Sequence, residues 1–477
     1  MQREPSFKPI NSRPARGTNW LPIILGGGLA LVVACAAAFA LLAFFWQPSV
    51  PNDINSPPTP AGVVVSFVTT TPTAQGNIPP TATLPPPPVQ DTPTLVEQQP
   101  THTPTAAGNP SPTLAPETPD SPDPTPTPKP PSPPSAPVDD SFAVGIQVDP
   151  AGDPGEITAH LKSLGVKWVK FQMSWEETEP QPGVRNWGEW DRLILAYHNA
   201  GFNILLSVVK APDWARPANT DLSQEGPPAD PATYAAFVGE MAKRYKGGVQ
   251  AIEVWNEQNL AREGGGAPMP PADYVALLSA AYQAINTADP SIVVVSGAPT
   301  PAGDVPGAAI DDINYLNAMY AAGLKNVSDA IGVHPSGYNC PATADWQSVS
   351  DPAASFRGPF DNRHHSWCFR GTMEGYRNVM VANGDANKRL WPTEFGWAVS
   401  STPQTGYEYA VDNTREEQAQ WIVEAFQQAK AWGWVGPMFL WNLNYGVTRP
   451  GSEQAAFSIL TAQGTTPAYQ SLAGMPR

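Results

Sequence analysis

Eight short apolar runs alternate with longer amphipathic stretches between residues 141 and 477, and this alternation constrains the fold more than any other feature. Strands that alternate with helices pair in parallel, because the chain must cross over between consecutive strands. Eight such units fit a closed barrel better than an open sheet, so the pattern predicts a (β/α)8 TIM barrel over residues 139–477. The runs are AVGIQV (143–148), WVKFQMS (168–174), NILLSVV (203–209), AIEVW (251–255), IVVVSG (292–297), AIGVH (330–334), LWPTEF (390–395) and MFLWN (438–442).

The stretches between the runs carry signals that are typical of helix ends. Residues 231–247 follow Asp230, a good N-cap, and begin with Pro231, which suits the first helical position. Residues 414–433 open with a capping threonine and acidic residues in the first turn. A doubly wound sheet is the alternative fold, but it should have a glycine-rich phosphate turn after its first strand, and VDPAGDPGE (148–156) is not one.

The chain ahead of this region has a different character. Residues 20–46 carry no charge and are long enough to cross a bilayer. Arg3, Lys8, Arg13 and Arg16 precede this run and almost no basic residue follows it closely. The positive-inside rule therefore predicts a single-pass cell-membrane anchor, with residues 1–19 as a cytoplasmic tail and the rest of the chain extracellular.

Residues 47–138 are rich in proline, threonine and serine, as in PTPTPKPPSPPSAP (124–137). Such a segment has too few apolar side chains to offset the entropy of ordering, so we expect a disordered linker. The formal net charge of the chain is −16 and no basic cluster is present in the sequence. This balance argues against nucleic acid as a partner, because phosphate backbones are bound by basic surfaces. We expect a monomer.

The chain has three cysteines, too few for a disulfide scaffold. Cys340 and Cys368 lie in one long, loop-like stretch and could pair if that stretch is outside the cell. Two unpaired thiols are the alternative, because the sequence does not give the Cα separation that a bridge requires.

Two carboxylates stand where strands end. Glu257 follows the fourth apolar run, and Glu394 lies at the end of the seventh. In a closed parallel barrel the C-terminal ends of all strands meet at one mouth, so these side chains can converge. Hydrolysis of a glycosidic bond needs such a pair, with one acid to protonate the leaving oxygen and one carboxylate to attack the anomeric carbon.

Residues 141–477 resemble the clan A retaining glycoside hydrolases, most closely the family 5 (cellulase-like) and family 39 (β-xylosidase-like) members. The resemblance rests on WNE (255–257), HPSGY (334–338), TEFGW (393–397) and LWNLN (440–444), in this order, and on SWEETEPQPG (174–183). It implies that Glu257 is the general acid/base and that Glu394 is the nucleophile.

The resemblance also implies a set of substrate-binding residues. Asn256 would hydrogen-bond the sugar 2-hydroxyl, Tyr338 would hydrogen-bond the nucleophile, and His334 would line the sugar subsite. Trp441 would form the floor of that subsite. Trp175 and Trp214 would be further candidates for stacking on a sugar, and Lys170 would be a cation near the nucleophile.

Two positions depart from the clan pattern. Lys170 stands where the clan usually has an arginine, and VVKAPDW (208–214) offers no match to the family 5 histidine after strand three. Lysine keeps the positive charge but loses the bidentate fork of arginine.

Two adjacent histidines raise the question of a metal site. His364 and His365 are adjacent, but no acidic or cysteine partner has ligand spacing in the sequence, so we interpret them as surface residues. No metal and no cofactor is predicted. The sequence thus favours a membrane-anchored retaining glycosidase with a carbohydrate substrate. The alternatives are a catalytically inactive carbohydrate-binding or adhesion module on the same barrel and, with less support, a metal-dependent barrel hydrolase.

Overall fold

The computed structural model describes residues 139–218 and 220–477. The predicted tail (1–19), membrane anchor (20–46) and linker (47–138) lie outside these residues. Within the described part of the chain, no helix combines the length and the apolar character needed to cross a membrane.

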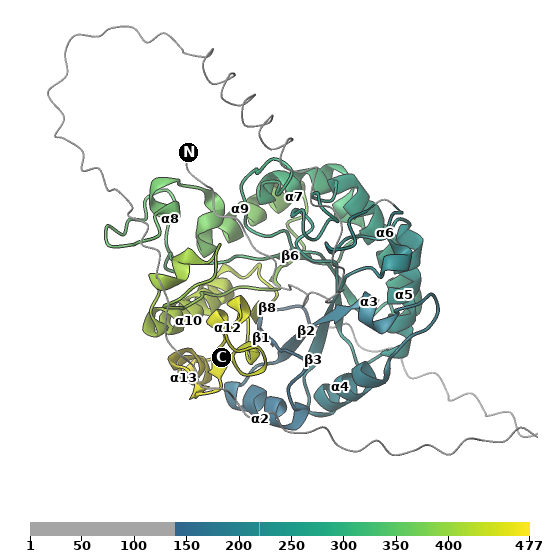
Figure 1. The fold of residues 1–477 in the computed structure, drawn as a ribbon, viewed down its shortest axis with the longest axis horizontal. Helices are drawn as coiled ribbons and strands as arrows, with labels where there is room; N and C mark the ends of the chain where they lie inside the picture. Colours follow the sequence, from purple (N-terminus) through teal and green to yellow (C-terminus); the bar gives the residue numbers. More distant parts are fainter. Residues whose placement is uncertain (1–138, 219) are drawn as a thin grey trace, which may run out of the picture. The chain divides into compact units, whose positions relative to one another are not determined.

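Eight parallel strands form a closed barrel at the centre of the molecule (Figure 1). Six of them form one hydrogen-bonded sheet in the order β5-β4-β3-β2-β1-β8, and β6 pairs with β7. Parallel bridges close the two remaining seams, between Val295 and Ala330 on one side and between Phe395 and Leu440 on the other. The strands are β1 (Ala143–Gln147), β2 (Trp168–Ser174), β3 (Asn203–Val209), β4 (Ala251–Val254), β5 (Val293–Ser296), β6 (Ile331–Val333), β7 (Leu390–Pro392) and β8 (Pro437–Leu440).

Each strand lies inside or almost inside the apolar run that predicted it, so the barrel prediction is confirmed and the doubly wound alternative is wrong. Helices surround the strands (Figure 1). The longer ones are α2 (Pro154–Leu164), α4 (Gly188–Asn199), α5 (Pro231–Arg244), α6 (Pro271–Ala288), α7 (Asp312–Ala321), α9 (Phe369–Ala382), α10 (Arg415–Trp432) and α13 (Pro467–Gly474). Short helices α3 (Trp175–Thr178), α8 (Gly358–Asp361), α11 (Tyr445–Thr448) and α12 (Glu453–Phe457) lie in the connections that follow strands.

The predicted helix signals act as expected. The Asp230 side chain accepts a hydrogen bond from the Ala232 amide at the start of α5. Thr414 and Glu417 form a reciprocal capping box at the start of α10, and Gly433 ends that helix at a φ of 71°, where glycine carries no side-chain penalty. These local choices fix where the two helices begin and end, and therefore how long the connecting loops can be.

The barrel interior is built in two layers that follow the period of two along each strand. The layer near the N-terminal ends of the strands is apolar and consists of Trp168, Leu205, Ala251, Val295, Ala330, Trp391 and Phe439. A second layer, two residues further along the strands, is polar and contains Lys170, Ser207, Glu253 and Thr393, all fully buried. Only the C-terminal end of the barrel therefore offers polar groups for a site.

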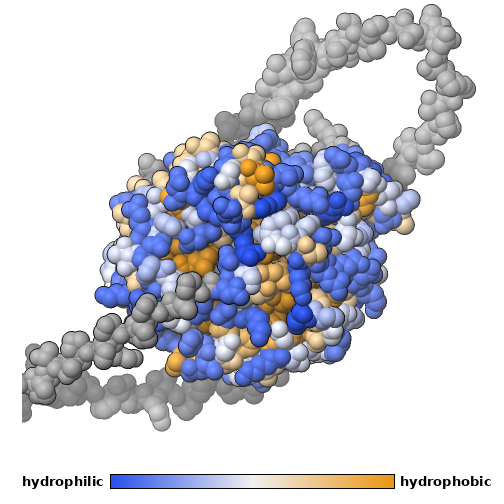
Figure 2. All heavy atoms as spheres, turned by 180° about the vertical axis from the view of Figure 1, so that it is seen from behind, coloured by the Kyte–Doolittle hydropathy of each residue, from blue (hydrophilic) through white to orange (hydrophobic). Residues whose placement is uncertain are grey.

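The outer face of the domain is mostly polar. Figure 2 shows polar side chains over most of the face opposite to the view in Figure 1, with apolar residues in smaller areas between them. Among the described residues, the large apolar side chains that are strongly exposed are aliphatic: Val184, Leu195, Leu222, Val381, Val411 and Val447.

Candidate active site

One pocket lies at the C-terminal ends of the strands and encloses about 640 Å³, including the open solvent at its mouth. The loops after β4, β5, β6, β7 and β8 supply its walls. The lining residues are Glu257, Arg262, Thr300, His334, Ser336, Tyr338, Glu394, Phe395, Gly396, Gly406, Tyr407, Tyr409, Trp441, Glu453, Gln454 and Phe457.

Glu394 enters the pocket directly after β7 and is held from below by a lysine. Its Oε1 atom is 2.9 Å from Nζ of Lys170, which β2 carries in the polar layer of the barrel. The same Nζ lies 3.1 Å from Oε2 of Glu253 on β4. Lys170 is fully buried and is not among the residues that line the pocket. Its observed contacts are with Glu394 and Glu253, and its predicted role in substrate binding stays a prediction.

The charge of this triad depends on the lysine. Burial alone would lower the pKa of Lys170, but Glu253 and Glu394 outweigh that effect and raise it. Thr393 supports the arrangement by donating a 2.6 Å hydrogen bond to Oε1 of Glu253. One cation thus compensates two carboxylates in a space from which water is largely excluded.

We expect Lys170→Met to lower the free energy of unfolding at pH 7 by about 3–5 kcal/mol, because it leaves two buried carboxylates without a cation. The raised pKa of Lys170 means that its stabilisation is fully present below its unfolded-state pKa, so pH 7 is a suitable condition. Urea unfolding would measure the change. The control is Lys162→Met, an exposed lysine on α2, which should change the free energy by no more than about 0.5 kcal/mol. Equal values for the two variants would contradict this account.

The carboxylate of Glu257 contacts an arginine and a histidine. Its Oε1 atom is 3.1 Å from Nδ1 of His334, which follows β6. Its Oε2 atom forms an ion pair with Arg262, which lies five residues later in the same loop. Burial alone would raise the pKa of Glu257, but Arg262, His334 and Thr300 outweigh it and lower the pKa to about 2. Glu257 is therefore ionised at neutral pH when the pocket holds only these residues.

The backbone around this carboxyl is strained. Trp255 and Glu257 have φ angles of 72° and 43°, and Tyr338 on the opposite side of the pocket has 49°. Non-glycine residues rarely adopt such values, and structures retain them mainly where a site fixes a side chain in place. A hydrogen bond from the Glu257 amide to the Ala298 carbonyl oxygen, at 3.0 Å, holds the loop against β5. Local strain thus contributes to turning Glu257 into the pocket.

Several predicted residues surround the same space. His334 and Trp441 line the pocket, and Trp441 packs against Tyr445 with 5.1 Å between ring centroids. Tyr338 also lines it, but its hydroxyl donates to the carbonyl oxygen of Pro301 at 3.2 Å, which differs from the predicted partner Glu394. Asn256 is buried beside Glu257 but is not among the described residues that line the pocket, and its Oδ1 atom has no hydrogen-bond partner among the described residues. An acceptor in this state suits a ligand hydroxyl.

The two remaining tryptophans lie elsewhere. Trp175 is fully buried, stacks on Phe237 at 5.5 Å and donates its indole hydrogen to Glu179. Trp214 packs edge-on against Trp175 at 5.7 Å. Neither is among the described residues that line the pocket. Trp175 follows β2 and the half-buried Trp214 follows β3, and they pack against one another, so substrate binding by either stays a prediction.

The sequence analysis missed Arg262, Tyr407 and Glu453, all of which line the pocket. Arg262 could have been considered from the sequence, since it is a basic residue only five positions after Glu257 in the same loop. Tyr407 and Glu453 come from the connections after β7 and β8, and no pattern in those connections indicates which side chains turn inward. The pocket therefore contains a third carboxyl besides the predicted pair.

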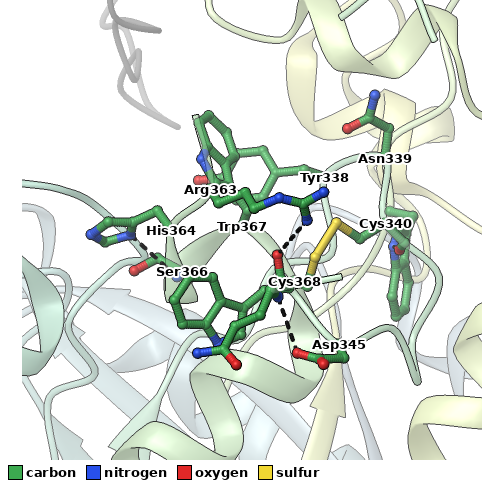
Figure 3. The surroundings of a disulfide bond; sticks show 12 residues. Tyr338, Asn339, Cys340, Asp345, Arg363, His364, Ser366, Trp367 and Cys368 are labelled. Atoms are coloured by element: carbon green, nitrogen blue, oxygen red, sulfur yellow. Dashed lines mark hydrogen bonds between the residues drawn. A yellow bond between two sulfur atoms is a disulfide. The ribbon is translucent and has the colours of Figure 1, made fainter. Parts of the chain in front are cut away.

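The long connection between β6 and α9 begins at the pocket, which His334, Ser336 and Tyr338 line, and Figure 3 shows the disulfide that lies within it. A disulfide joins Cys340 and Cys368 within it, with 5.4 Å between the Cα atoms. Trp367, next to Cys368, packs edge-on against Tyr338 at 4.7 Å between centroids. The disulfide thus links the start of the connection, at the pocket, to the start of α9.

Comparison with solved structures supports the fold. A family 39 glycoside hydrolase from the gut symbiont Bacteroides cellulosilyticus WH2 is similar, with a TM-score of 0.52 and 21% identity over 70% of this chain and 63% of that chain. The chain thus spans less than two thirds of that protein's length. GH10 from Paenibacillus barcinonensis has a TM-score of 0.45 and 17% identity over 71% of this chain and 96% of that chain. At such identities the likeness to the family 39 structure establishes a TIM-barrel fold. No family model and no curated protein match the sequence.

Proposed function

We propose that this protein is a glycoside hydrolase that cleaves O-glycosidic bonds of a β-linked oligo- or polysaccharide with retention of anomeric configuration. The observation that carries the proposal is that Glu257 and Glu394, from different strands, line one pocket. A sugar ring between them would meet an apolar wall at Trp441 and polar groups at the opposite side. The name of the family 39 neighbour describes the same class of enzyme.

In this mechanism Glu394 attacks the anomeric carbon while the bond to the leaving oxygen breaks, which forms a glycosyl ester on Glu394. Glu257 donates a proton to the leaving oxygen and then, as a carboxylate, takes a proton from the water that hydrolyses the ester. The ester forms and breaks with inversion each time, so the product keeps the configuration of the substrate. Lys170, whose Nζ is 2.9 Å from Oε1 of Glu394, holds this carboxyl in place for the attack.

The ion pair with Arg262 sets a condition on the first step. Because the pKa of Glu257 is about 2 in the free pocket, its carboxyl carries no proton at neutral pH. A sugar that separates Arg262 from Glu257 would remove the main attraction that holds the carboxyl ionised, and burial would then favour the protonated form. Proton donation in this enzyme is therefore coupled to the movement of Arg262.

We expect Arg262→Met to move the basic limb of the pH profile of kcat/KM to higher pH, because this limb reports the pKa of the acid in the free enzyme. For a substrate with a poor leaving group, kcat/KM at pH 7 should rise at least tenfold, which corresponds to about 1.4 kcal/mol. The change should be small for a dinitrophenyl glycoside, whose leaving group needs no proton. Steady-state kinetics on both substrates would measure it.

The matched variant is Arg262→Lys, which keeps the positive charge and should leave the basic limb near its parent position. If both variants shift the limb equally, the charge of Arg262 does not control the proton on Glu257. Folding of each variant should be checked by circular dichroism, since Glu257 is buried and loses its cation in the methionine variant.

The same ion pair favours a second candidate, a carbohydrate-binding or adhesion module without turnover. If Arg262 stays on Glu257 when a glycan binds, the pocket recognises sugar but offers no proton. Glycans would then bind and never shorten.

The test of the proposed function is digestion of a panel of β-linked glycans by the full-length chain, followed by NMR of the freshly released reducing end. The proposal expects shortened products that first appear as the β-anomer. Products that first appear as the α-anomer would contradict the retaining mechanism, and binding without cleavage across the panel would favour the second candidate.

The apolar run at residues 20–46 also leads us to propose where in the cell the protein lies. An anchor there, followed by a proline-rich linker, would hold the barrel outside the cell membrane, where polysaccharide substrates are accessible. Protease treatment of intact cells should then remove the barrel from the cell surface. Full protection of the barrel in intact cells, with cleavage only after lysis, would contradict this orientation.

A further inference from the structure

A second group of chemically active side chains lies outside the pocket, where the loop before α7 meets the connection before α9. Oδ2 of Asp311 is 3.0 Å from Nε2 of His364 and 3.1 Å from Nε2 of His365. The three ligand-type atoms lie within 4.8 Å of one another. Both histidines were predicted to be surface residues because no acidic or cysteine partner has ligand spacing, and Asp311 is more than fifty residues away in the chain. In the structure they are half-buried and face this aspartate.

Two aspartates of this group are withdrawn from solvent. Asp311 and Asp312 are both buried, and Asp312 is fully so. Within residues 139–218 and 220–477, the ion pairs found for these two aspartates are with histidines alone. Oδ2 of Asp312 is buried without a hydrogen-bond partner in the described structure. Imidazole rings are therefore the ion-pair partners of both buried carboxyl groups.

The second ring nitrogen of His365 is already oriented. Its Nδ1 atom is 3.1 Å from Oγ of Ser366, which in turn donates a 2.5 Å hydrogen bond to Oδ1 of Asp312. This chain makes Nδ1 of His365 the donor to Ser366, so that in the neutral ring Nε2 carries the lone pair that a metal ligand requires. A histidine oriented by a buried carboxylate in this way is characteristic of metal sites.

We propose that Asp311, His364 and His365 bind a divalent transition metal ion of the zinc type. Zinc accepts imidazole nitrogen and carboxylate oxygen at about 2.0–2.2 Å. Tetrahedral ligands at such bond lengths stand roughly 3.3 Å apart, close to the two separations observed here. His364 must then give up the 3.3 Å hydrogen bond that its Nδ1 accepts from the Ser366 amide (Figure 3). The partial exposure of the two histidines leaves room for a water molecule as fourth ligand.

The place of the ion in the fold suggests what it does. Asp311 caps α7, whereas His364 and His365 belong to the connection that the Cys340–Cys368 disulfide closes. A bound ion would join these two segments, and it would stabilise the connection without taking part in bond cleavage. This role is independent of the proposed glycosidase activity.

The experiment is zinc binding by the full-length chain after treatment with a chelator and removal of the chelator. Equilibrium dialysis against Zn²⁺ at pH 7.5 should give one tightly held ion per chain, together with a higher unfolding temperature. Mg²⁺ should not compete, because imidazole ligands favour zinc over magnesium. Uptake should weaken below about pH 6, because protons compete for the imidazole nitrogens.

The variants His365→Ala and Asp311→Asn should lose the ion and the rise in unfolding temperature. The control is His198→Ala, an exposed histidine near the end of α4, which should bind zinc like the parent. No stoichiometric uptake by the parent would overturn the proposal, whatever the variants do. Unchanged uptake by a folded His365→Ala variant would also overturn it.

Discussion

Glu394→Gln should lower kcat on any substrate of this enzyme by at least about 10⁴-fold, because an amide cannot attack the anomeric carbon. The substitution keeps the size of the side chain. Lys170 retains Glu253 at 3.1 Å as a partner, so the polar layer of the barrel keeps a charge pair. We therefore expect the variant to unfold at a urea concentration close to that of the parent. Kinetics with an aryl β-glycoside and urea unfolding together would measure both effects.

The control for this prediction is Glu416→Gln, which changes an exposed carboxyl in the first turn of α10 and should leave kcat unchanged. A folded Glu394→Gln variant that retains parent activity would show that another group attacks the sugar. In that case the third carboxyl of the pocket, Glu453, would be the first to examine.

Glu257→Gln should affect substrates according to their leaving groups. For a glycan or an alkyl glycoside, loss of the proton donor should lower kcat/KM by about 10²–10⁴-fold. For a dinitrophenyl glycoside, formation of the glycosyl ester needs no proton, so the rate of that step should change little. Rapid-mixing measurements of dinitrophenolate release would follow the first step separately from the later hydrolysis of the ester.

A variant that changes the partner of Glu257 but keeps both the ion pair and the acid provides the comparison. Arg262→Lys keeps both charges, so its ratio of rates on the two substrates should stay near that of the parent. If Glu257→Gln slows both substrates by the same factor, Glu257 would contribute to binding or folding and not to proton transfer.

The sequence predicted the barrel because its signals are local. Each strand corresponds to a short apolar run that can be recognised in the sequence. A capping residue such as Thr414 acts within one helical turn. The pairing of Glu257 with Glu394 was also accessible, since parallel strands place their C-terminal ends at one mouth whatever lies between them. Both side chains do line the same pocket.

The roles of the other residues depended on packing that no local pattern reveals. Trp175 and Trp441 have the same aromatic chemistry, yet the helices outside the barrel bury the first, and the pocket exposes the second to a ligand. Arg262 reaches Glu257 because the loop after β4 adopts positive φ angles at Trp255 and Glu257. Its effect on the proton of Glu257 follows from this geometry, and spacing in the sequence does not determine it.

Formation of a covalent ester on Glu394 is the central claim, and trapping that ester tests it most directly. The full-length chain would be incubated with dinitrophenyl 2-deoxy-2-fluoro-β-glycosides of several sugars, then digested and analysed by mass spectrometry. Fluorine at carbon 2 slows both steps, and the activated leaving group lets the ester accumulate. We expect one fluorosugar on the peptide that contains Glu394 and none in Glu394→Gln. A label on another residue would contradict the account, as would glycan hydrolysis with no label from any sugar in the panel.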